Sequence, residues 1–341
     1  MRSLVRTGVV GLLAVGLLAV FLRNADLGRV WEALRGARPG LVLAGVALTL
    51  VTYLVRAERW QYLLEPLGPT RYATAFRATV IGFAATAVLP ARAGEVIRPY
   101  LLARREGLSA TAAFATIVVE RVLDLVAVLI LLAAALLLVE PGVERQASAV
   151  FTAVRLGGLV MAPLALAALV VMFVLAGHPD WLQAGLERAR RILSARVAAA
   201  VTRAVRMFAS GFGVLRRPER LAASLGWSLA LWGVIGVETW VVARAFDIPI
   251  SVTGAWLLQA LLVVGVSVPT PGGVGGFHEA FRLGATALFG ADNDVAIAAA
   301  ITLHAISFVP VTLLGLWYAA REGLDLRGMR EMSGRPVEAD A

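Results

Sequence analysis

The sequence predicts an all-α polytopic membrane protein, with about six full spans and two re-entrant hairpins arranged as an inverted repeat. The chain has 341 residues, of which 59% are hydrophobic, and its mean hydropathy of +0.80 is too high for a soluble domain. Apolar runs of about 20 residues recur, which is long enough to cross a hydrocarbon core of about 30 Å. Two further apolar runs are broken by proline and glycine at corresponding places in the two halves of the chain. Such paired breaks are the best sequence indication of a binding site between inverted repeats.

The predicted elements follow from the apolar runs in order. Two runs, 73–89 and 252–268, lead directly into the breaks. Irregular backbone at membrane depth is tolerated only where protein or a watery cavity satisfies its polar groups. We therefore expect these two runs to enter and leave the membrane on one side; full crossing of both, giving eight spans, is the alternative. The six full spans are predicted at 5–22, 41–55, 111–139, 153–176, 221–245 and 295–319.

The distribution of arginine predicts the orientation, because arginine-rich segments stay in the cytoplasm. Segment 177–220 carries nine arginines against three acidic residues, so we expect a cytoplasmic amphipathic segment on the anionic leaflet. Loop 140–152 has two glutamates and one arginine and is expected outside. Both termini, including a short tail, are then cytoplasmic. The halves 1–150 and 151–341 have opposite orientations.

Composition excludes several classes of function. The chain has no cysteine, which excludes disulfides, thiolate metal sites and cysteine nucleophiles. Its net charge of +9 lies mainly in loops, so we assign it to the membrane surface and to orientation rather than to nucleic acid. With three scattered histidines and no cysteine, no catalytic metal site and no cofactor are expected.

The first break contains Arg92, Glu95 and Arg98, spaced three residues apart. If the chain is helical from Gly94, these side chains fall near one face. Arginine suits phosphate because its planar fork donates two parallel hydrogen bonds and stays charged when partly desolvated. We therefore name them as substrate-binding or gating residues. The alternative is a charge cluster that only fixes topology.

A second charged group lies within the predicted span 111–139. Glu120 and Asp124 share a helical face, with Arg121 beside them. Each ion at this depth costs several kcal/mol by insertion scales. We expect these residues to pair with Arg92 or Arg98, or to include a proton-responsive carboxylate. An internal network that only packs the helix is the alternative.

The second break supplies backbone amides without side-chain bulk. Glycine lets a headgroup or a helix approach the backbone closely, and a helix that starts near Gly276 attracts an anion to its N-terminus. His278 and Glu279 lie in that first turn. A tight turn with structural glycines is the alternative. The candidate residues are Pro271, Gly272, Gly273, Gly275, Gly276 and Glu279.

Secondary candidates lie elsewhere. Arg56, Arg59 and Trp60 follow the second predicted span, where an anchor at the membrane surface is the default interpretation. Glu238 is a lone carboxylate inside the span 221–245 and is a candidate for function. His304, in the last span, is expected to be a packing histidine with its hydrogen bonds satisfied.

Four motifs follow one another along the chain. They are Arg56-x-x-Arg59-Trp60-x-x-Leu63-Leu64, Leu89-Pro90-x-Arg92-x-Gly94-Glu95-x-x-Arg98, Glu120-Arg121-x-x-Asp124 and Pro269-Thr270-Pro271-Gly272-Gly273-Val274-Gly275-x-x-x-Glu279. Together they resemble the lysylphosphatidylglycerol synthase transmembrane-region family, which includes the flippase part of the multiple peptide resistance factor and stand-alone flippase-like proteins. The resemblance extends from about Gly8 to Glu322.

The resemblance implies a multi-pass protein of a bacterial or archaeal cytoplasmic membrane that moves a phospholipid between leaflets, in the family typically an aminoacylated phosphatidylglycerol. Bifunctional members carry a soluble aminoacyl-transferase domain in addition. The chain ends about 20 residues after its last predicted span, so we expect no such domain, no synthase activity and no enzyme. No GxxxxGK motif is present, so ATP-driven transport is not expected.

Two other functions remain open. One is an intramembrane enzyme that acts on a lipid phosphate or polyprenyl phosphate, with Glu95 or Glu279 as general acid–base. The other is a membrane subunit that holds a separate synthase or glycosyltransferase through segment 177–220.

The orientation map makes a prediction that single-cysteine labelling can check, because the native chain has no cysteine. Cysteines at Ser148, Ile248 and Gly290 should react with an impermeant reagent outside intact cells. Cysteines at Ser109, Ser194 and Met329 should react only after the cells are permeabilised. Labelling of the Ser194 variant from outside would contradict the map.

Overall fold

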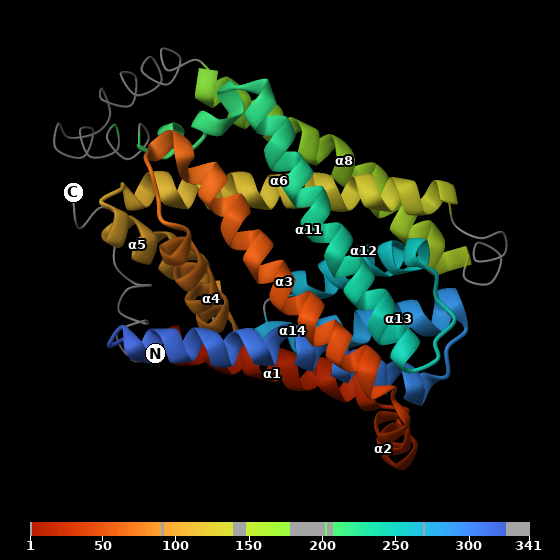
Figure 1. The fold of residues 1–341 in the computed structure, drawn as a ribbon. Helices are drawn as coiled ribbons and strands as arrows, with labels where there is room; N and C mark the ends of the chain where they lie inside the picture. The colour runs from red at the N-terminus through yellow and green to blue at the C-terminus, as the bar shows by residue number, and fades with distance from the viewer. Residues whose placement is uncertain are drawn as a thin grey trace.

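The computed structural model describes residues 2–89, 92–138, 148–177, 202, 207–268 and 270–324, and these residues form helices and no strand. The helices are arranged as an elongated bundle (Figure 1). Five helices in this part of the chain are long and apolar enough to span a membrane, and they overlap five of the six predicted spans. The predicted all-α membrane bundle is confirmed. The five are α3 (Pro39–Leu64), α6 (Ala110–Leu138), α8 (Ser148–Gly177), α11 (Pro218–Ala245) and α14 (Asn293–Arg321).

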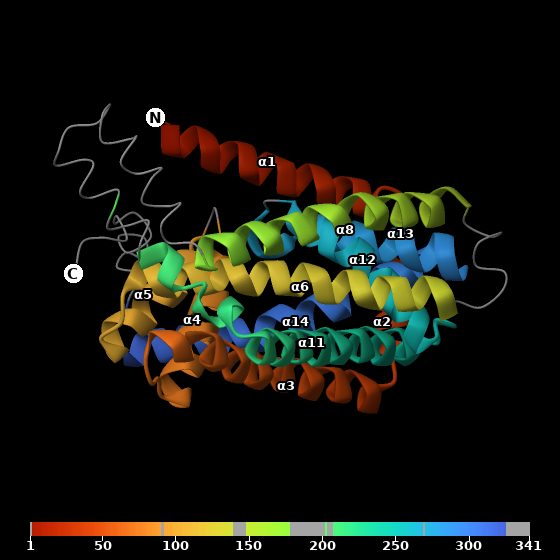
Figure 2. The ribbon, with the colours of Figure 1, turned by 90° about the horizontal axis from the view of Figure 1, so that it is seen from above.

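The sixth predicted span is also helical, as α1 (Arg2–Leu22). Seen from above, α1 and α3 lie at opposite edges of the bundle, with α6 and α14 between them (Figure 2). Helix α8 exposes a long row of large apolar side chains, including Leu159, Leu166 and Phe173. Such a surface is expected where a helix faces lipid.

The first break forms a hairpin of two short helices, α4 (Tyr72–Val88) and α5 (Gly94–Glu106). The 17 residues of α4 extend about 25 Å, which is less than the hydrocarbon thickness. Arg71, just before α4, forms an ion pair of 3.3 Å with Glu106 at the end of α5. The hairpin therefore returns to the end of the bundle from which it starts.

The second break forms the corresponding hairpin, α12 (Val252–Ser267) and α13 (Gly276–Phe289). A Cβ on Gly254 at the start of α12 would lie 2.8 Å from the Phe289 ring at the end of α13. The two outer ends of this hairpin are therefore also side by side. Both breaks thus form hairpins whose outer ends lie side by side, which is the arrangement that re-entry requires, and α13 begins at Gly276 as predicted.

The tips of the two hairpins meet in the middle of the bundle. The Nη2 atom of Arg92 donates a hydrogen bond of 2.8 Å to the carbonyl oxygen of Val266, near the end of α12. A short 3₁₀ helix, η4 (Pro271–Gly273), packs against α4. A Cβ on Gly272 would lie 3.8 Å from the carbonyl oxygen of Ala87. Each break thus supplies backbone or side-chain contacts to the other.

Charged side chains gather at the two ends of the bundle. At one end Arg29 forms an ion pair of 2.9 Å with Asp292, which connects α2 (Leu27–Gly36) to the start of α14. At the other end Arg220 pairs with Glu65 at 3.0 Å, and Arg105 pairs with Glu322 at 3.1 Å. The region between carries the long apolar helices, as a membrane protein requires.

The structure differs from the sequence prediction in one additional helix and in one helix boundary. Helix α2 lies between the first two spans, where no element was predicted; Asp26 starts it by accepting hydrogen bonds from the backbone N–H groups of Gly28 and Arg29. Helix α3 continues to Leu64, nine residues beyond the predicted end of the second span. It therefore carries Arg56, Arg59 and Trp60 into the bundle rather than to its surface.

Other predictions fall outside the described residues. The amphipathic segment 177–220 lies mostly in 178–201 and 203–206, and the tail lies in 325–341. The order of elements is the same in the two parts of the chain: α1, α3, α4–α5, α6 and then α8, α11, α12–α13, α14. The division into inverted halves at residue 150 stays a prediction.

The α4–α5 hairpin depends on a close approach between two glycines. A Cβ on Gly94 would lie 1.7 Å from the carbonyl oxygen of Gly82 and 2.3 Å from the Thr86 hydroxyl oxygen. Backbone cannot yield to such a clash as a flexible side chain can. Gly94 is therefore required for the two helices to pack.

We expect Gly94→Ala to lower the unfolding temperature in detergent by roughly 5 °C or more, because overpacking typically costs about 1–3 kcal/mol. Gly226→Ala in α11 is the control, since nothing lies within 4 Å of its added Cβ. The control should match or slightly exceed wild type because alanine favours helix. Equal melting of the two variants would contradict this packing.

Candidate functional site

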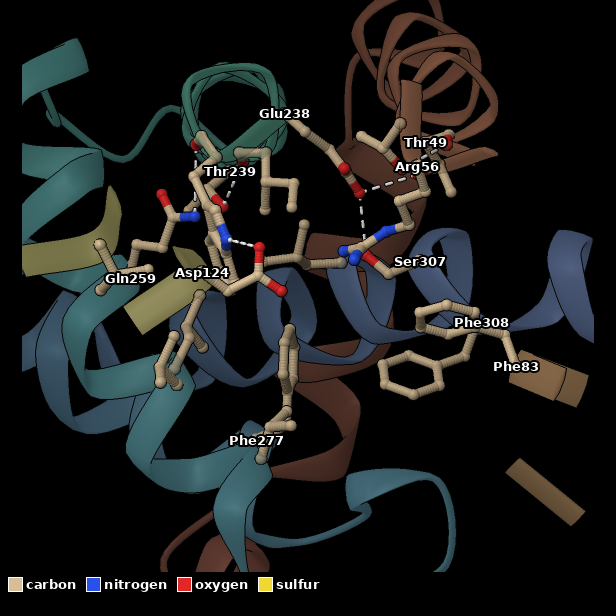
Figure 3. A pocket seen from close by; sticks show the side chains of 18 of the residues that line it. Thr49, Arg56, Phe83, Asp124, Glu238, Thr239, Gln259, Phe277, Ser307 and Phe308 are labelled. Atoms are coloured by element: carbon tan, nitrogen blue, oxygen red, sulfur yellow. Dashed lines mark hydrogen bonds between the residues drawn. The ribbon is translucent and has the colours of Figure 1, made fainter. Parts of the chain in front are cut away.

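A cavity of about 380 Å³ lies in the middle of the bundle. Its walls come from α3, α6, α11, α14 and α12 of the second hairpin. The first hairpin adds Phe83 and Arg92, and α13 adds Phe277. Figure 3 shows polar side chains of α3, α11 and α14 on one side and aromatic rings on the other. The cavity therefore lies where the two breaks meet, as the sequence predicted for a polar site.

Behind one wall lies a buried charge network centred on Arg59 of α3. Its side chain is 0% exposed. It pairs with Asp124 of α6, to which it donates from both terminal nitrogens, and with Glu120 at 3.2 Å. A further hydrogen bond of 2.8 Å goes to the Ser228 hydroxyl oxygen of α11. One guanidinium thus connects three long helices.

Arg98 of α5 joins the same network from the first hairpin. Its Nη1 atom donates to Glu120 at 3.0 Å, and its guanidinium carbon lies 3.9 Å from the centre of the Trp60 ring. The Trp60 indole in turn donates to the Thr116 hydroxyl at 3.0 Å. The predicted pairing between Arg98 and the carboxylates of α6 is confirmed.

The network reaches the cavity at Arg121 and Asp124. The Arg121 side chain is 41% exposed and contacts Glu120 and, at 3.6 Å, Asp124. The Trp232 indole of α11 donates to Asp124 at 2.8 Å. Three arginines (59, 98 and 121) share two carboxylates, so this network carries one positive charge in excess. That excess makes the wall attractive to an anion.

Arg56 lines the cavity one helical turn before Trp60. Its guanidinium carbon lies 5.0 Å from the Phe83 ring centre and 5.8 Å from that of Tyr53. No carboxylate of the described residues forms an ion pair with it, and its Nε atom is buried without a hydrogen-bond partner. The side chain is oriented by aromatic faces, which leaves its donors free for a ligand.

Arg92 lies at the cavity edge between the hairpin tips. It is a non-glycine residue with a positive φ of 53°, a conformation that turns the chain sharply and is uncommon for arginine. Besides the carbonyl oxygen of Val266, it contacts Glu95 at 3.8 Å. Glu95 lines a smaller cavity of about 50 Å³ with Arg98 and Arg121.

The opposite wall holds Glu238 of α11, which is 3% exposed. Its Oε1 atom accepts hydrogen bonds of 2.8 Å from the hydroxyl groups of Thr49 and Ser307. These donors come from α3 and α14, as Figure 3 shows. The sequence prediction of a buried lone carboxylate is confirmed.

Only some of the site residues predicted from the sequence line this cavity. Arg56, Arg92, Arg121, Asp124 and Glu238 line it. The predicted surface anchor at Arg56, Arg59 and Trp60 is wrong. Arg59 and Trp60 are fully buried, because the carboxylates of α6 neutralise a guanidinium that would otherwise be unstable there.

The glycines of the second break do not line the cavity. Their polar groups are bonded locally: His278 Nδ1 accepts from the backbone N–H of Gly275 at 3.3 Å, and His304 Nε2 lies 2.8 Å from the Gly272 carbonyl oxygen. His304 also stacks on Phe308, as expected of a packing histidine. The geometry favours the structural interpretation for Pro271, Gly272, Gly273, Gly275 and Gly276.

Glu279 also lies away from the cavity. Arg282, one helical turn later, donates to both of its carboxylate oxygens at 2.8 and 2.5 Å. Thr49, Ser307 and Gln259 also line the cavity and were not predicted from the sequence. An amide in the middle of the apolar run 252–268 was the signal that could have identified Gln259.

Long apolar helices, two re-entrant hairpins and a buried polar cavity define an integral membrane protein. Residues 6–315 match the family described as lysylphosphatidylglycerol synthase TM region. Because this match covers most of the chain, the protein belongs to that family, as the motifs predicted.

Two curated proteins are similar to the chain. "Glycosyltransferase AglD" of Haloferax volcanii is 28% identical over 326 residues, which covers 89% of the chain and 52% of that protein. "UPF0104 membrane protein MJ1595" of Methanocaldococcus jannaschii is 27% identical over 118 residues, covering 33% of the chain and 35% of that protein. The chain thus spans about half the length of the first relative.

The first relative corrects one expectation. The chain was predicted not to be an enzyme. A protein with an enzyme name aligns with 89% of the chain, and this finding overturns that prediction.

The buried network predicts a large effect of Arg59 on stability. Arg59→Gln leaves Asp124 without its main buried partner, so we expect a loss of about 3–5 kcal/mol in the free energy of unfolding. Arg121→Gln should cost less, because that side chain is 41% exposed. Tryptophan fluorescence during unfolding in detergent measures both.

A double variant tests the cause of this loss. Arg59→Gln combined with Asp124→Asn leaves no unpaired charge at that contact and should recover part of the stability. Strictly additive losses would show that the ion pair contributes nothing beyond packing.

Proposed function

We propose that this protein carries the phosphate-bearing headgroup of a lipid between the two leaflets of a membrane, through the central cavity. The observation that supports this most strongly is the gathering of three guanidinium groups, those of Arg56, Arg92 and Arg121, around a cavity of about 380 Å³. That volume is within the range of small-ligand sites and is suited to a headgroup rather than to a whole lipid.

The charges around the cavity favour an anion. The three arginines exceed the two lining carboxylates, Asp124 and Glu238, by one. The Asp124 carboxylate moreover already forms an ion pair with Arg59, which lies behind the cavity wall. The planar fork of arginine matches two phosphate oxygens at once, and hydrogen bonds inside a protein are stronger than in bulk water.

The apolar part of the lining suits the remainder of a lipid. Phe83, Phe277 and Phe308 come from the two hairpins and α14. Phe83 and Phe308 offer aromatic surface on the side of the cavity where Arg56 lies (Figure 3). A lipid carrier needs this combination, because the headgroup requires polar partners while the attached chains remain in an apolar environment.

The meeting of two hairpin tips supports alternate opening. Each hairpin starts from and returns to its own end of the bundle, and the tips contact each other beside the cavity. Movement of one hairpin away from the contact between the tips would open the cavity toward one end of the bundle. In many transporters the repeats move in this way around a fixed site.

Transfer of a glycosyl group to or from a lipid phosphate is a second candidate function, favoured by the similarity to a protein named as a glycosyltransferase. The same arginines would hold the lipid phosphate. Of the two carboxylates predicted as general acid–base, Glu95 faces the small cavity beside Arg98, whereas Glu279 is bonded to Arg282. In a second version of this candidate function, a separate glycosyltransferase catalyses the transfer and this chain is its membrane partner.

Sugar transfer can be tested directly. The purified chain is mixed with a polyprenyl phosphate and radiolabelled nucleotide sugars, and labelled lipid is extracted. Product made by wild type and lost in Glu95→Gln supports intramembrane catalysis. Product that requires an added transferase supports the partner arrangement.

For the carrier, we predict that Arg56→Gln slows lipid movement at least about tenfold, because a hydrogen bond to a charged group contributes about 1.5–3 kcal/mol. Arg56 is the sharpest choice, since it forms no ion pair with the described residues and its loss leaves no carboxylate unpaired. Vesicles containing fluorescent phosphatidylglycerol are treated with dithionite, and the bleached fraction is followed.

Arg155→Gln is the matched control, because Arg155 is an exposed arginine on α8. It should behave as wild type at equal protein content. Equal bleaching in wild type, Arg56→Gln and protein-free vesicles, over anionic, zwitterionic and aminoacylated lipids, would end the carrier proposal.

A further inference from the structure

Three carboxylates lie within the bundle at or behind the cavity wall, and one differs from the other two. Glu120 and Asp124 each contact at least two arginines within 4 Å. Such partners keep a carboxylate ionised. For Glu238, no ion pair is found among the described residues, and its observed hydrogen-bond donors are the hydroxyl groups of Thr49 and Ser307.

Hydroxyl partners suit a group that changes its protonation state. A serine or threonine hydroxyl donates to an ionised carboxylate and, after rotation, accepts from a protonated one. An arginine can only donate, so it stabilises the ionised form alone. Glu238 is 3% exposed and lies well inside α11, where ionisation without a cation is costly. Its site can therefore hold either form of the carboxyl group.

The titratable groups that share the cavity with Glu238 come from several elements. Helix α3 contributes Tyr53 and Arg56, α6 contributes Arg121 and Asp124, and the first hairpin contributes Arg92. The neighbouring amide of Gln259 on α12 is uncharged. On α14, His304 lies one turn before Ser307, but its Nε2 atom contacts the Gly272 carbonyl. Glu238 thus shares one cavity with the arginines that the proposed function assigns to phosphate.

We propose that Glu238 is a proton-binding site and that the lipid anion and a proton occupy the cavity together. This inference rests on the proposed function of the cavity and adds its energy source. An ionised Glu238 repels a phosphate bound in the same cavity, and this repulsion is strong where the dielectric constant is low. Protonation removes that negative charge, so proton binding raises the affinity for the anion.

The coupling is reciprocal, because two ligands that favour each other do so by the same factor. A headgroup therefore loads best from the more acidic side, with a proton on the carboxylate. On the less acidic side the proton leaves to water, and the returning negative charge on Glu238 expels the phosphate. Only the carboxyl O–H bond forms and breaks in this cycle.

The test uses proteoliposomes with fluorescent phosphatidylglycerol, whose phosphodiester keeps one negative charge, unlike a phosphomonoester with a second pKa of about 6. Movement is followed with and without a pH difference across the bilayer. Wild type should move the lipid faster from the acidic side, up to a limit of about tenfold per pH unit for one proton per lipid.

Glu238→Gln should lose this response, so that its rate no longer depends on the direction of the pH difference. Glu219→Gln is the control, because Glu219 is exposed in the first turn of the same helix. It should keep the wild-type response. Equal responses in wild type and Glu238→Gln would overturn the proposal.

Ser307→Ala provides a second test that retains the carboxylate. Removing one hydroxyl donor disfavours the ionised form, so the pH profile of transport should move to higher pH. An unchanged profile would count against Glu238. If no variant or wild type moves lipid at any pH, the proposed function itself fails; movement that ignores pH in wild type overturns the proton coupling alone.

Discussion

The ion pair between Arg59 of α3 and the carboxylates of α6 is the contact on which the rest of the structure depends. A guanidinium with 0% exposure is unstable inside a bundle unless carboxylates neutralise it and its donors are satisfied. Asp124 and Glu120 meet this requirement, and Arg98 brings the first hairpin to the same carboxylates. The relative placement of three elements is therefore fixed by charge, in a region where apolar contacts between helices give little directional preference.

This network also explains why the cavity keeps unsatisfied positive charge. Its three arginines share two carboxylates, and the one at the cavity edge, Arg121, is the most exposed. Arg56, one turn from the network, has aromatic neighbours and forms no ion pair with the residues that the structure describes. Structural charges are thus paired and buried, whereas the charges available to a ligand lie at the cavity surface.

Much of the architecture could be predicted from the sequence because apolar length and Pro/Gly breaks are local signals. The hairpins and the spans follow from them. The burial of Arg59 and Trp60 could not be predicted, because these residues look like a surface anchor until Asp124, 65 positions away, is known to face them. Thr49, Ser307 and Gln259 were missed for a similar reason: single hydroxyl or amide groups in a span have meaning only when a carboxylate or a cavity is found beside them. The glycines of the second break were overinterpreted, since Gly272 and Gly275 are bonded to His304 and His278 and do not line the cavity.

The contact between Arg92 and the Val266 carbonyl has a consequence for turnover. One N–H group of the Arg92 guanidinium is already bonded to the backbone of the second hairpin, and a headgroup that draws this side chain farther into the cavity must break that bond. The occupied state is then less favourable than three free arginines would make it. Departure of the headgroup restores that bond. An intramolecular competitor of this kind lowers the affinity of the cavity for the headgroup. It therefore helps a cavity lined by several arginines to release the headgroup.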